Sequence, residues 1–271
     1  MGLLNGIFGA LVNLMVSPCK GFPWLGLVLV SVATGALMLL IYKHTSNQAG
    51  IKKSKDQIKA RLLEMLLFRD DIVVSFRSQI GILKANLMYM GYAIVPLIVI
   101  LPVIALLLSQ LEAWYGMRPL KIGESTLLKV SLKQAGPGLP DAALEVSDGL
   151  TVDTPAFRAP NGREIYWRIR AAQEGTHETR VLINGAEAVK SIAVMGGFQR
   201  LSERRGSSIL DQILYPVERP LDKNSAIARM DISYPDSKVK LGSWEQHWLI
   251  YFFAFSILFA FALRGPLGVE I

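Results

Sequence analysis

The sequence has little of the chemistry that metal centres, disulfide frameworks and hydrolytic sites use. It holds a single cysteine, Cys19, and three histidines in 271 residues. One cysteine excludes an intramolecular disulfide and a multi-cysteine metal site. The histidines, His44, His177 and His247, lack metal-motif spacing, and no glycine-rich phosphate loop or nucleophile elbow occurs. We therefore expect no catalytic residue, no metal and no cofactor, and we expect that the protein is not an enzyme.

Charge is missing from the centres of three long apolar runs, residues 22–42, 87–111 and 244–263. The absence of Asp, Glu, Lys and Arg there removes the usual sign of an ion-coupled transporter. The chain is 51% hydrophobic, and each run is long enough for a membrane span of about 20 residues. We predict a multi-pass protein of the inner (plasma) membrane, with the lipid bilayer as its first partner.

Positive charge is concentrated in the loop 43–86 between the first two runs. Nine Lys or Arg and four Asp or Glu give this loop a net charge of +5 (nine minus four), against +7 for the whole chain. The positive-inside rule places such a loop in the cytoplasm. The N-terminus and residues 112–243 then lie outside, and the tail 264–271 lies inside. Because topology explains the basic charge, we expect no specific nucleic-acid binding.

The basic loop has a helical pattern of apolar residues that is interrupted at Arg69-Asp70-Asp71. Asp70 or Asp71 is a suitable N-cap, so we predict helices over 49–68 and 71–86 joined by a tight turn. One arrangement is an antiparallel coiled-coil arm that projects from the membrane. The other is a pair of helices on the membrane surface, with their bases near anionic lipid headgroups.

Residues 112–243 change to the period-two pattern of strands, as in Ile165, Trp167 and Ile169. About six short strands over 124–194 predict an immunoglobulin-like β-sandwich, by architecture alone. Residues 196–240 are predicted as a short helix, a loop and a last strand.

The predicted fold class is therefore membrane α + β. Three transmembrane helices carry a cytoplasmic two-helix coiled-coil arm, and an extracytoplasmic sandwich is inserted before the last span. The predicted domains are an amphipathic interfacial helix (1–21), the first span (22–42), the basic helical hairpin (43–86), the second span (87–111), the β-rich domain (112–243), the third span (244–263) and a cytoplasmic tail (264–271).

A few polar residues occur in and beside the first two spans. Ser31 and Thr34 share one helical face, and Asn86 and Tyr89 are three residues apart, which also places them on one face of a helix. Hydroxyl and small residues are common where membrane helices pack together. The alternative is that these four residues line a shallow hydrophilic groove open to the cytoplasm.

The order of these elements resembles the YidC/oxidase-assembly membrane insertase superfamily, including its three-span archaeal and endoplasmic-reticulum members. The resemblance lies in the topology: an outside amphipathic helix, a span, a basic helical pair, a second span and a third span ending inside. It covers about half of the chain. The family implies insertion or assembly of membrane proteins through a polar groove, here Ser31, Thr34, Asn86 and Tyr89.

The same resemblance implies that the basic coil receives a nascent membrane protein or a ribosome. The residues concerned would be Lys52, Lys53, Lys55, Lys59 and Arg61. A second hypothesis is a non-catalytic scaffold subunit, whose β-sandwich binds an extracytoplasmic partner in a membrane complex. A third is a sensor in which a ligand of the sandwich moves the helical pair.

Overall fold

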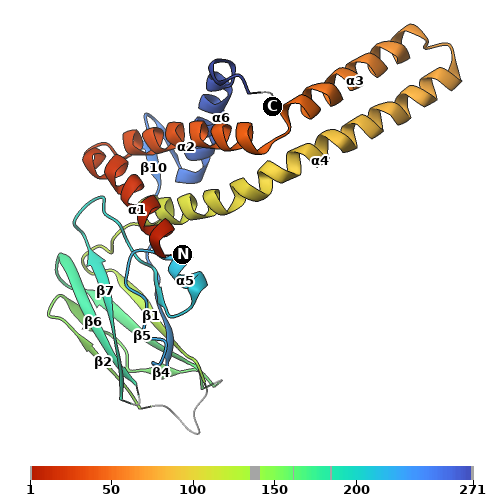
Figure 1. Cartoon of the computed structure of the whole chain (residues 1–271). Coiled ribbons are helices and arrows are strands. Elements are labelled where there is room, and N and C mark those ends of the chain that lie inside the picture. The colour runs from red at the N-terminus through yellow and green to blue at the C-terminus, as the bar shows by residue number, and fades with distance from the viewer. Residues whose placement is uncertain (1, 135–140, 161, 184, 270–271) are drawn as a thin grey trace. The chain divides into compact units, whose positions relative to one another are not determined.

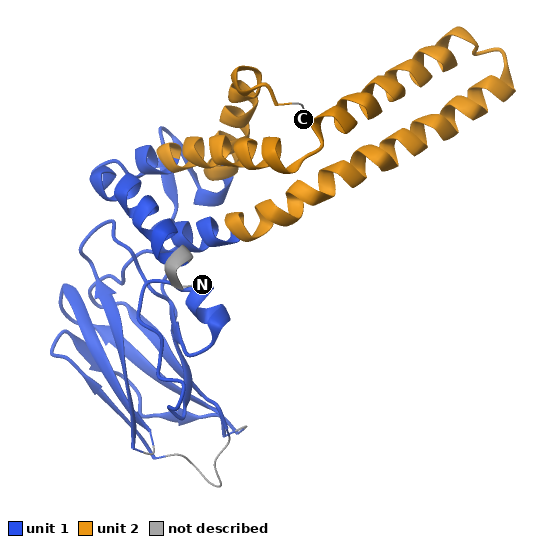
Figure 2. Ribbon diagram, viewed as in Figure 1, with its two compact units in different colours: residues 1–27, 105–250 blue, residues 28–104, 251–271 orange. Residues whose placement is uncertain are grey.

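A computed structural model of the chain describes residues 2–134, 141–160, 162–183 and 185–269 (Figure 1). The chain divides into two compact units (Figure 2). The mixed unit comprises residues 1–27 and 105–250, and the helical unit comprises residues 28–104 and 251–271.

Three helical stretches within the described ranges are long and apolar enough to cross a membrane: Pro23–Thr45, Ile72–Gly116 and Trp248–Leu267. The prediction of three long apolar helices is thereby confirmed. The helices are α1 (Gly2–Val16), α2 (Pro23–Thr45), α3 (Gln48–Leu67), α4 (Ile72–Leu111), α5 (Ile209–Leu214) and α6 (Trp248–Leu267), with short 3-10 and π turns η1 (Ser17–Cys19) and η2 (Glu112–Gly116).

Helix α4 is one continuous helix of 40 residues, where the sequence predicted a separate helix and span. The junction of the predicted helix 71–86 and the predicted span 87–111 contains no proline, so no helix stop signal separates them. Pro96 and Pro102 lie inside α4 without ending it. The second helix of the arm therefore passes directly into the second candidate span.

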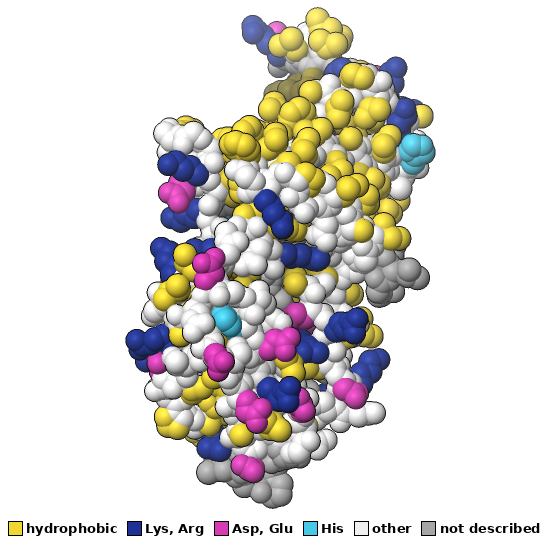
Figure 3. All heavy atoms as spheres, turned by 90° about the vertical axis from the view of Figure 1, so that its left-hand side faces the viewer, with side chains coloured by type: hydrophobic (Ala, Val, Ile, Leu, Met, Phe, Trp, Pro, Cys, Tyr) yellow, Lys and Arg dark blue, Asp and Glu magenta, His cyan; other side chains and the backbone are white. Residues whose placement is uncertain are grey.

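The helices carry a hydrophobic surface. Figure 3 shows hydrophobic side chains covering the helices, whereas charged side chains are scattered over the β-rich part of the chain. Large apolar residues of the spans are open to the surroundings, among them Ile98, which is 65% exposed, and Leu258, which is 60% exposed. Such an apolar surface is suited to a hydrocarbon environment and not to water.

The β-domain, residues 117–246 of the mixed unit, contains antiparallel sheets (Figure 1). The strands are β1 (Ser125–Leu132), β2 (Ala142–Val146), β3 (Leu150–Val152), β4 (Phe157–Arg158), β5 (Glu164–Ala171), β6 (Gly175–Ile183), β7 (Ala186–Val194), β8 (Arg204–Gly206), β9 (Ile227–Ile232), β10 (Val239–Leu241) and β11 (Trp244–Gln246). One sheet has the order β3-β5-β1-β9-β8, with β4 also paired to β5, and another has the order β2-β6-β7. The prediction of a separate β-rich region is confirmed.

Alternating residues of these strands form one hydrophobic core. Ile165, Trp167 and Ile169 on β5 are buried, as their period-two spacing predicts. The core also takes in residues beyond 194, including Leu201 and Met230. Strands β8 and β9 therefore belong to the main sheet, whereas the prediction treated residues 196–240 as an addition to a core at 124–194.

The third apolar helix begins later than predicted. Trp244 pairs with Leu241 in the β10–β11 ladder, and helix α6 starts at Trp248. Aromatic residues mark the ends of spans in a sequence, but they are also frequent in strands. The apolar pattern alone therefore did not separate the strand from the helix.

Candidate functional site

The candidate site in the helical unit is the arm, which we define as α3, the connecting residues 68–71 and residues 72–86 of α4. The two helices are antiparallel and joined by residues 68–71, where the Asp71 backbone nitrogen donates to the Phe68 carbonyl at 3.0 Å. The Asp71 carboxylate accepts hydrogen bonds from the backbone nitrogens of Val73 and Val74, at 2.9 and 3.1 Å. The predicted N-cap is therefore Asp71.

A polar cleft of about 460 Å³ lies between the two arm helices, next to Arg61 and Gly81. Arg61 lies so close to α4 that a Cβ on Gly81 would be 3.0 Å from its Nε. Its Nη1 is 2.6 Å from Glu64 Oε2, and this hydrogen bond lowers the pKa of the Glu64 carboxyl below its ordinary value. Arg61 thus brings a cation into the contact between the two arm helices.

Much of the apolar surface of the arm is uncovered. Ile72 is 83% exposed, Val73 77% and Leu67 76%. The other exposed members are Leu62, Leu63, Leu66, Phe68, Phe76, Ile80 and Leu83. We call these ten residues the arm patch. The stripe that was expected to pack one arm helix on the other is therefore largely available for contacts with another molecule.

The five predicted contact residues of α3 fall into two groups. Lys52, Lys53 and Lys59 are exposed, whereas Lys55 and Arg61 are half-buried against α4. The Lys55 ammonium lies 5.9 Å from the centre of the Tyr89 ring, which is within cation–π range. Lys55 and Tyr89 are the predicted site residues that the structure brings together.

Ser31 and Thr34 of the predicted groove are both buried, and Ser31 lies where α2 contacts α6. Ser256 Oγ donates to the Ser31 carbonyl at 3.3 Å, and Thr34 Oγ1 donates to the Val30 carbonyl of its own helix at 2.7 Å. Asn86 is exposed on α4, and Tyr89 is half-buried there. Ser31 thus contacts α6, and Thr34 bonds within its own helix.

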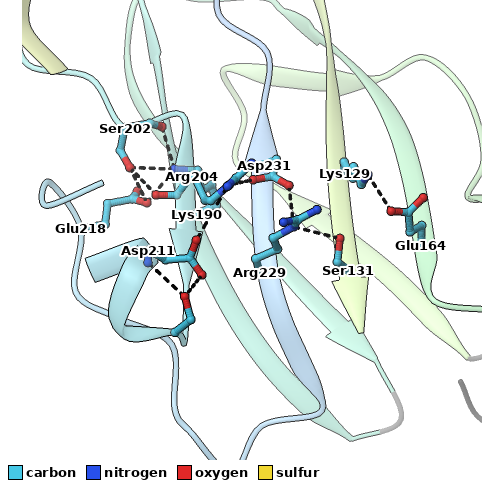
Figure 4. A network of polar contacts seen from close by, with 11 residues as sticks. Lys129, Ser131, Glu164, Lys190, Ser202, Arg204, Asp211, Glu218, Arg229 and Asp231 are labelled. Carbon is cyan, nitrogen blue, oxygen red and sulfur yellow. Dashed lines mark hydrogen bonds and ion pairs between the residues drawn. The ribbon is translucent and has the colours of Figure 1, made fainter. Parts of the chain in front are cut away.

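The β-domain holds a polar network that sequence reasoning missed (Figure 4). Lys190 is fully buried, and its Nζ lies 2.6 Å from Glu218 Oε2 and donates to the Ser202 carbonyl at 2.7 Å. Beside it, Asp231 pairs with Arg204 and with Arg229. Burial lowers the pKa of Lys190, and Glu218 opposes this shift. The sequence signal that could have revealed the buried lysine is its spacing: Lys190 shares the inward side of its strand with Ala188 and Ile192.

Across the described ranges, no group of three His, Cys, Asp or Glu side chains is placed to hold a metal ion. No family model matches the chain, and no curated protein matches it. Among solved structures, the S-layer protein rSbsC matches with 14% identity over 48% of this chain and a TM-score of 0.24. The match covers 22% of that protein's chain.

Proposed function

We propose that the protein is a multi-pass inner-membrane protein that assists the insertion or assembly of other membrane proteins. The arm is the receiving surface, and no covalent chemistry is involved. The observation that supports this role best is the arm patch. Ten large apolar side chains are exposed on a helical pair that continues into a candidate span.

The composition of the arm suits a hydrophobic helical segment as its substrate. Contiguous exposed apolar residues on a protein surface commonly mark an interaction site. An apolar helix can lie against such a surface through its own apolar face. Lys52, Lys53 and Lys59 are exposed on the same arm and would attract the acidic surface of a ribosome or an anionic headgroup.

The proposed orientation places the arm in the cytoplasm, where a nascent chain emerges. Its support is the charge of the loop 43–86, because the positive-inside rule retains such loops on the cytoplasmic side. The β-domain and the N-terminus then lie outside. Ser31, Thr34, Asn86 and Tyr89 remain the proposed polar path, and this part of the proposal requires α2 and α6 to separate around Ser31 when a substrate is engaged.

Site-specific photocrosslinking in membranes during translation tests the role of the arm. A photoreactive residue at Leu66, which is 71% exposed, or at Phe76, which is 63% exposed, should crosslink to apolar segments of nascent membrane proteins. The control position is Gln79, which is exposed on α4 but lies outside the arm patch. Crosslinks to many different nascent chains support the proposal.

A single stoichiometric protein crosslinked from both positions would instead identify a scaffold subunit of a membrane complex. Crosslinks to lipid alone would show that the arm lies on the membrane surface. Either result would overturn the insertase role. A charge variant, Phe76→Asp, should weaken the nascent-chain crosslinks from Leu66 several-fold, whereas Gln79→Asp should leave them unchanged.

A further inference from the structure

The mixed unit contains a cavity of about 410 Å³ beneath the N-terminal helix. Its wall on α1 is formed by Gly6, Gly9, Ala10 and Asn13, which share one face of the helix. Arg200 is among the residues that line the other side. This volume lies within the range of about 300–1,000 Å³ that small-molecule sites occupy. We call it the α1 cavity.

Arg200 is held in place but has no carboxylate partner among the described residues. Its Nη2 donates to Gln110 Oε1, and its Nε is buried without a hydrogen-bond acceptor. Burial lowers the pKa of this guanidinium, although arginine stays charged in proteins. Arg200 is half-buried, and a cation that is partly removed from water without a counter-ion is costly, so an anion at this point would be stabilising.

A relay of amides fixes the position of Arg200. Gln110 Nε2 donates to Asn5 Oδ1 at 2.5 Å, and Asn5 Nδ2 donates to the Gln212 carbonyl at 2.8 Å. Gly9 permits the close approach of α1, since a Cβ there would lie 3.2 Å from Gln110 Oε1. The guanidinium is therefore preorganised before any ligand arrives, which lowers the entropic cost of binding.

The one carboxylate in the wall of the cavity is already neutralised. Glu218 lies 2.6 Å from the Lys190 ammonium and accepts a hydrogen bond from the Ser191 backbone nitrogen at 3.1 Å. The charges of Glu218 and Lys190 cancel, and Arg200 leaves a net charge of +1. The electrostatics of the α1 cavity thus favour an anion.

The cavity lies at the end of a candidate membrane span. Gln110 is in the last turn of α4, and Trp114 immediately beyond donates to Asn13 Oδ1 at 3.0 Å. The side of α1 next to the cavity is apolar and uncovered: Ile7 is 54% exposed, Leu11 49% and Leu14 73%. A polar cavity beside an exposed apolar helix face at a span end corresponds to the boundary between lipid headgroups and acyl chains.

We propose that the α1 cavity binds the phosphate of a phospholipid headgroup through Arg200, with the acyl chains lying along Ile7, Leu11 and Leu14. A guanidinium can donate two parallel hydrogen bonds to a phosphate, which makes arginine well suited to this ligand. The bound lipid would hold α1 in the interface and join it to the β-domain. This site requires that the helices cross a membrane, but it is independent of the insertase role.

The test measures binding of phosphatidylglycerol by the full-length protein in a phosphate-free detergent, using native mass spectrometry after delipidation. The wild-type protein should retain phosphatidylglycerol, and Arg200→Gln should weaken this binding at least tenfold. Arg219→Gln is the matched control, because Arg219 carries the same charge close by in sequence but is exposed. The binding of phosphatidylglycerol by Arg219→Gln should differ from that of the wild type by less than twofold.

Gly6→Leu provides a second variant that removes no hydrogen bond. A Cβ at Gly6 meets no atom within 4 Å, so a larger side chain can enter the cavity. Leucine also has a higher helix propensity than glycine, so α1 should form normally. This variant should lose phosphatidylglycerol as Arg200→Gln does, and an unchanged melting curve would confirm that both variants fold.

The identity of the ligand is tested with two further probes. Diacylglycerol has the acyl chains without the phosphate and should not bind, and inorganic phosphate at micromolar concentration should not displace the lipid. Displacement by inorganic phosphate would overturn the lipid as the source of the anion. Wild-type binding of phosphatidylglycerol by both Arg200→Gln and Gly6→Leu would overturn the site itself.

Discussion

Gly35 of α2 lies directly against the backbone of Ser256 on α6, where a Cβ would be 2.8 Å from the Ser256 carbonyl oxygen. Ser256 also donates to the Ser31 carbonyl, one turn earlier on α2. Small residues permit such close contacts between membrane helices, where van der Waals packing replaces the hydrophobic effect. The pair α2–α6 is therefore joined at a point that tolerates no side chain.

The close contact predicts that Gly35→Val separates α2 from α6. The loss of packing should cost about 1–3 kcal/mol, the usual range for overpacking a well-filled interface. The measurement is the thermal stability of the purified protein in detergent. Gly91→Val is the matched control, since Gly91 also lies in an apolar helix but a Cβ there meets nothing within 4 Å. Equal melting temperatures for Gly35→Val and Gly91→Val would contradict a tight contact between α2 and α6 at Gly35.

The N-cap of α4 predicts a local effect in the arm. Asp71→Ala removes the acceptor for the Val73 and Val74 amides and should cost about 1 kcal/mol of helix stability. Hydrogen exchange at these amides should accelerate about fivefold. Asp70→Ala is the control, because the Asp70 side chain is 97% exposed and pairs only loosely with Arg69. Its exchange rates should match those of the wild type.

The buried pair Lys190–Glu218 predicts a large destabilisation when one partner is removed. Lys190→Ala leaves the Glu218 carboxylate without its cation, which typically costs about 3–5 kcal/mol. Arg180→Ala on the neighbouring strand breaks an exposed pair with Glu187 and should cost less than about 1 kcal/mol. Denaturant unfolding followed by tryptophan fluorescence measures both values.

The double variant Lys190→Met with Glu218→Gln distinguishes the charge from the packing. It removes both buried charges and keeps similar volumes, so it should recover much of the stability that Lys190→Ala loses. No recovery would mean that the hydrogen bonds to Ser202, rather than the ion pair, account for the effect.

The Arg118–Glu124 pair predicts a dependence of stability on pH. Glu124 accepts hydrogen bonds from both Nη atoms of Arg118 and from the Lys121 backbone nitrogen, each at 2.9 Å, and these lower its pKa from 4.5 to about 2. As the pH falls, Glu124 is therefore protonated in the unfolded chain before it is protonated in the folded chain. The stabilisation is present above about pH 4.5 and is lost between pH 4.5 and 2.

The measurement compares the wild type with Glu124→Gln across this range. Because the pair is partly exposed, the wild type should be more stable by about 1 kcal/mol at pH 7. This advantage should vanish towards pH 2. A difference that stays constant with pH would show that the carboxylate charge makes no contribution.

Local patterns in the sequence were sufficient for part of the fold. The absence of charge identified the three apolar helices, and the period-two spacing of Ile165, Trp167 and Ile169 identified the inward side of β5. These properties depend on neighbours only a few residues away. The immunoglobulin-like label, the membrane orientation and the coiled-coil arrangement stay predictions.

Features that depend on distant parts of the chain were not predicted. Strand β1 pairs with β9, about one hundred residues later, with Val130 opposite Met230. The α1 cavity likewise combines Gly6 with Arg200, and no spacing rule connects them. Periodicity shows which side of an element is buried, but it does not show which other element covers that side.

The start of the β-domain is joined to the segment that follows strand β9. Met117 and Asp236 form a β-bridge, the Arg118 nitrogen donates to the Pro235 carbonyl at 3.0 Å, and the Ser237 nitrogen donates to the Gly116 carbonyl at 2.9 Å. Bridged residues are only about 5 Å apart, a gap that a two-residue hairpin can close. The backbone therefore enters and leaves strands β1–β9 at neighbouring points.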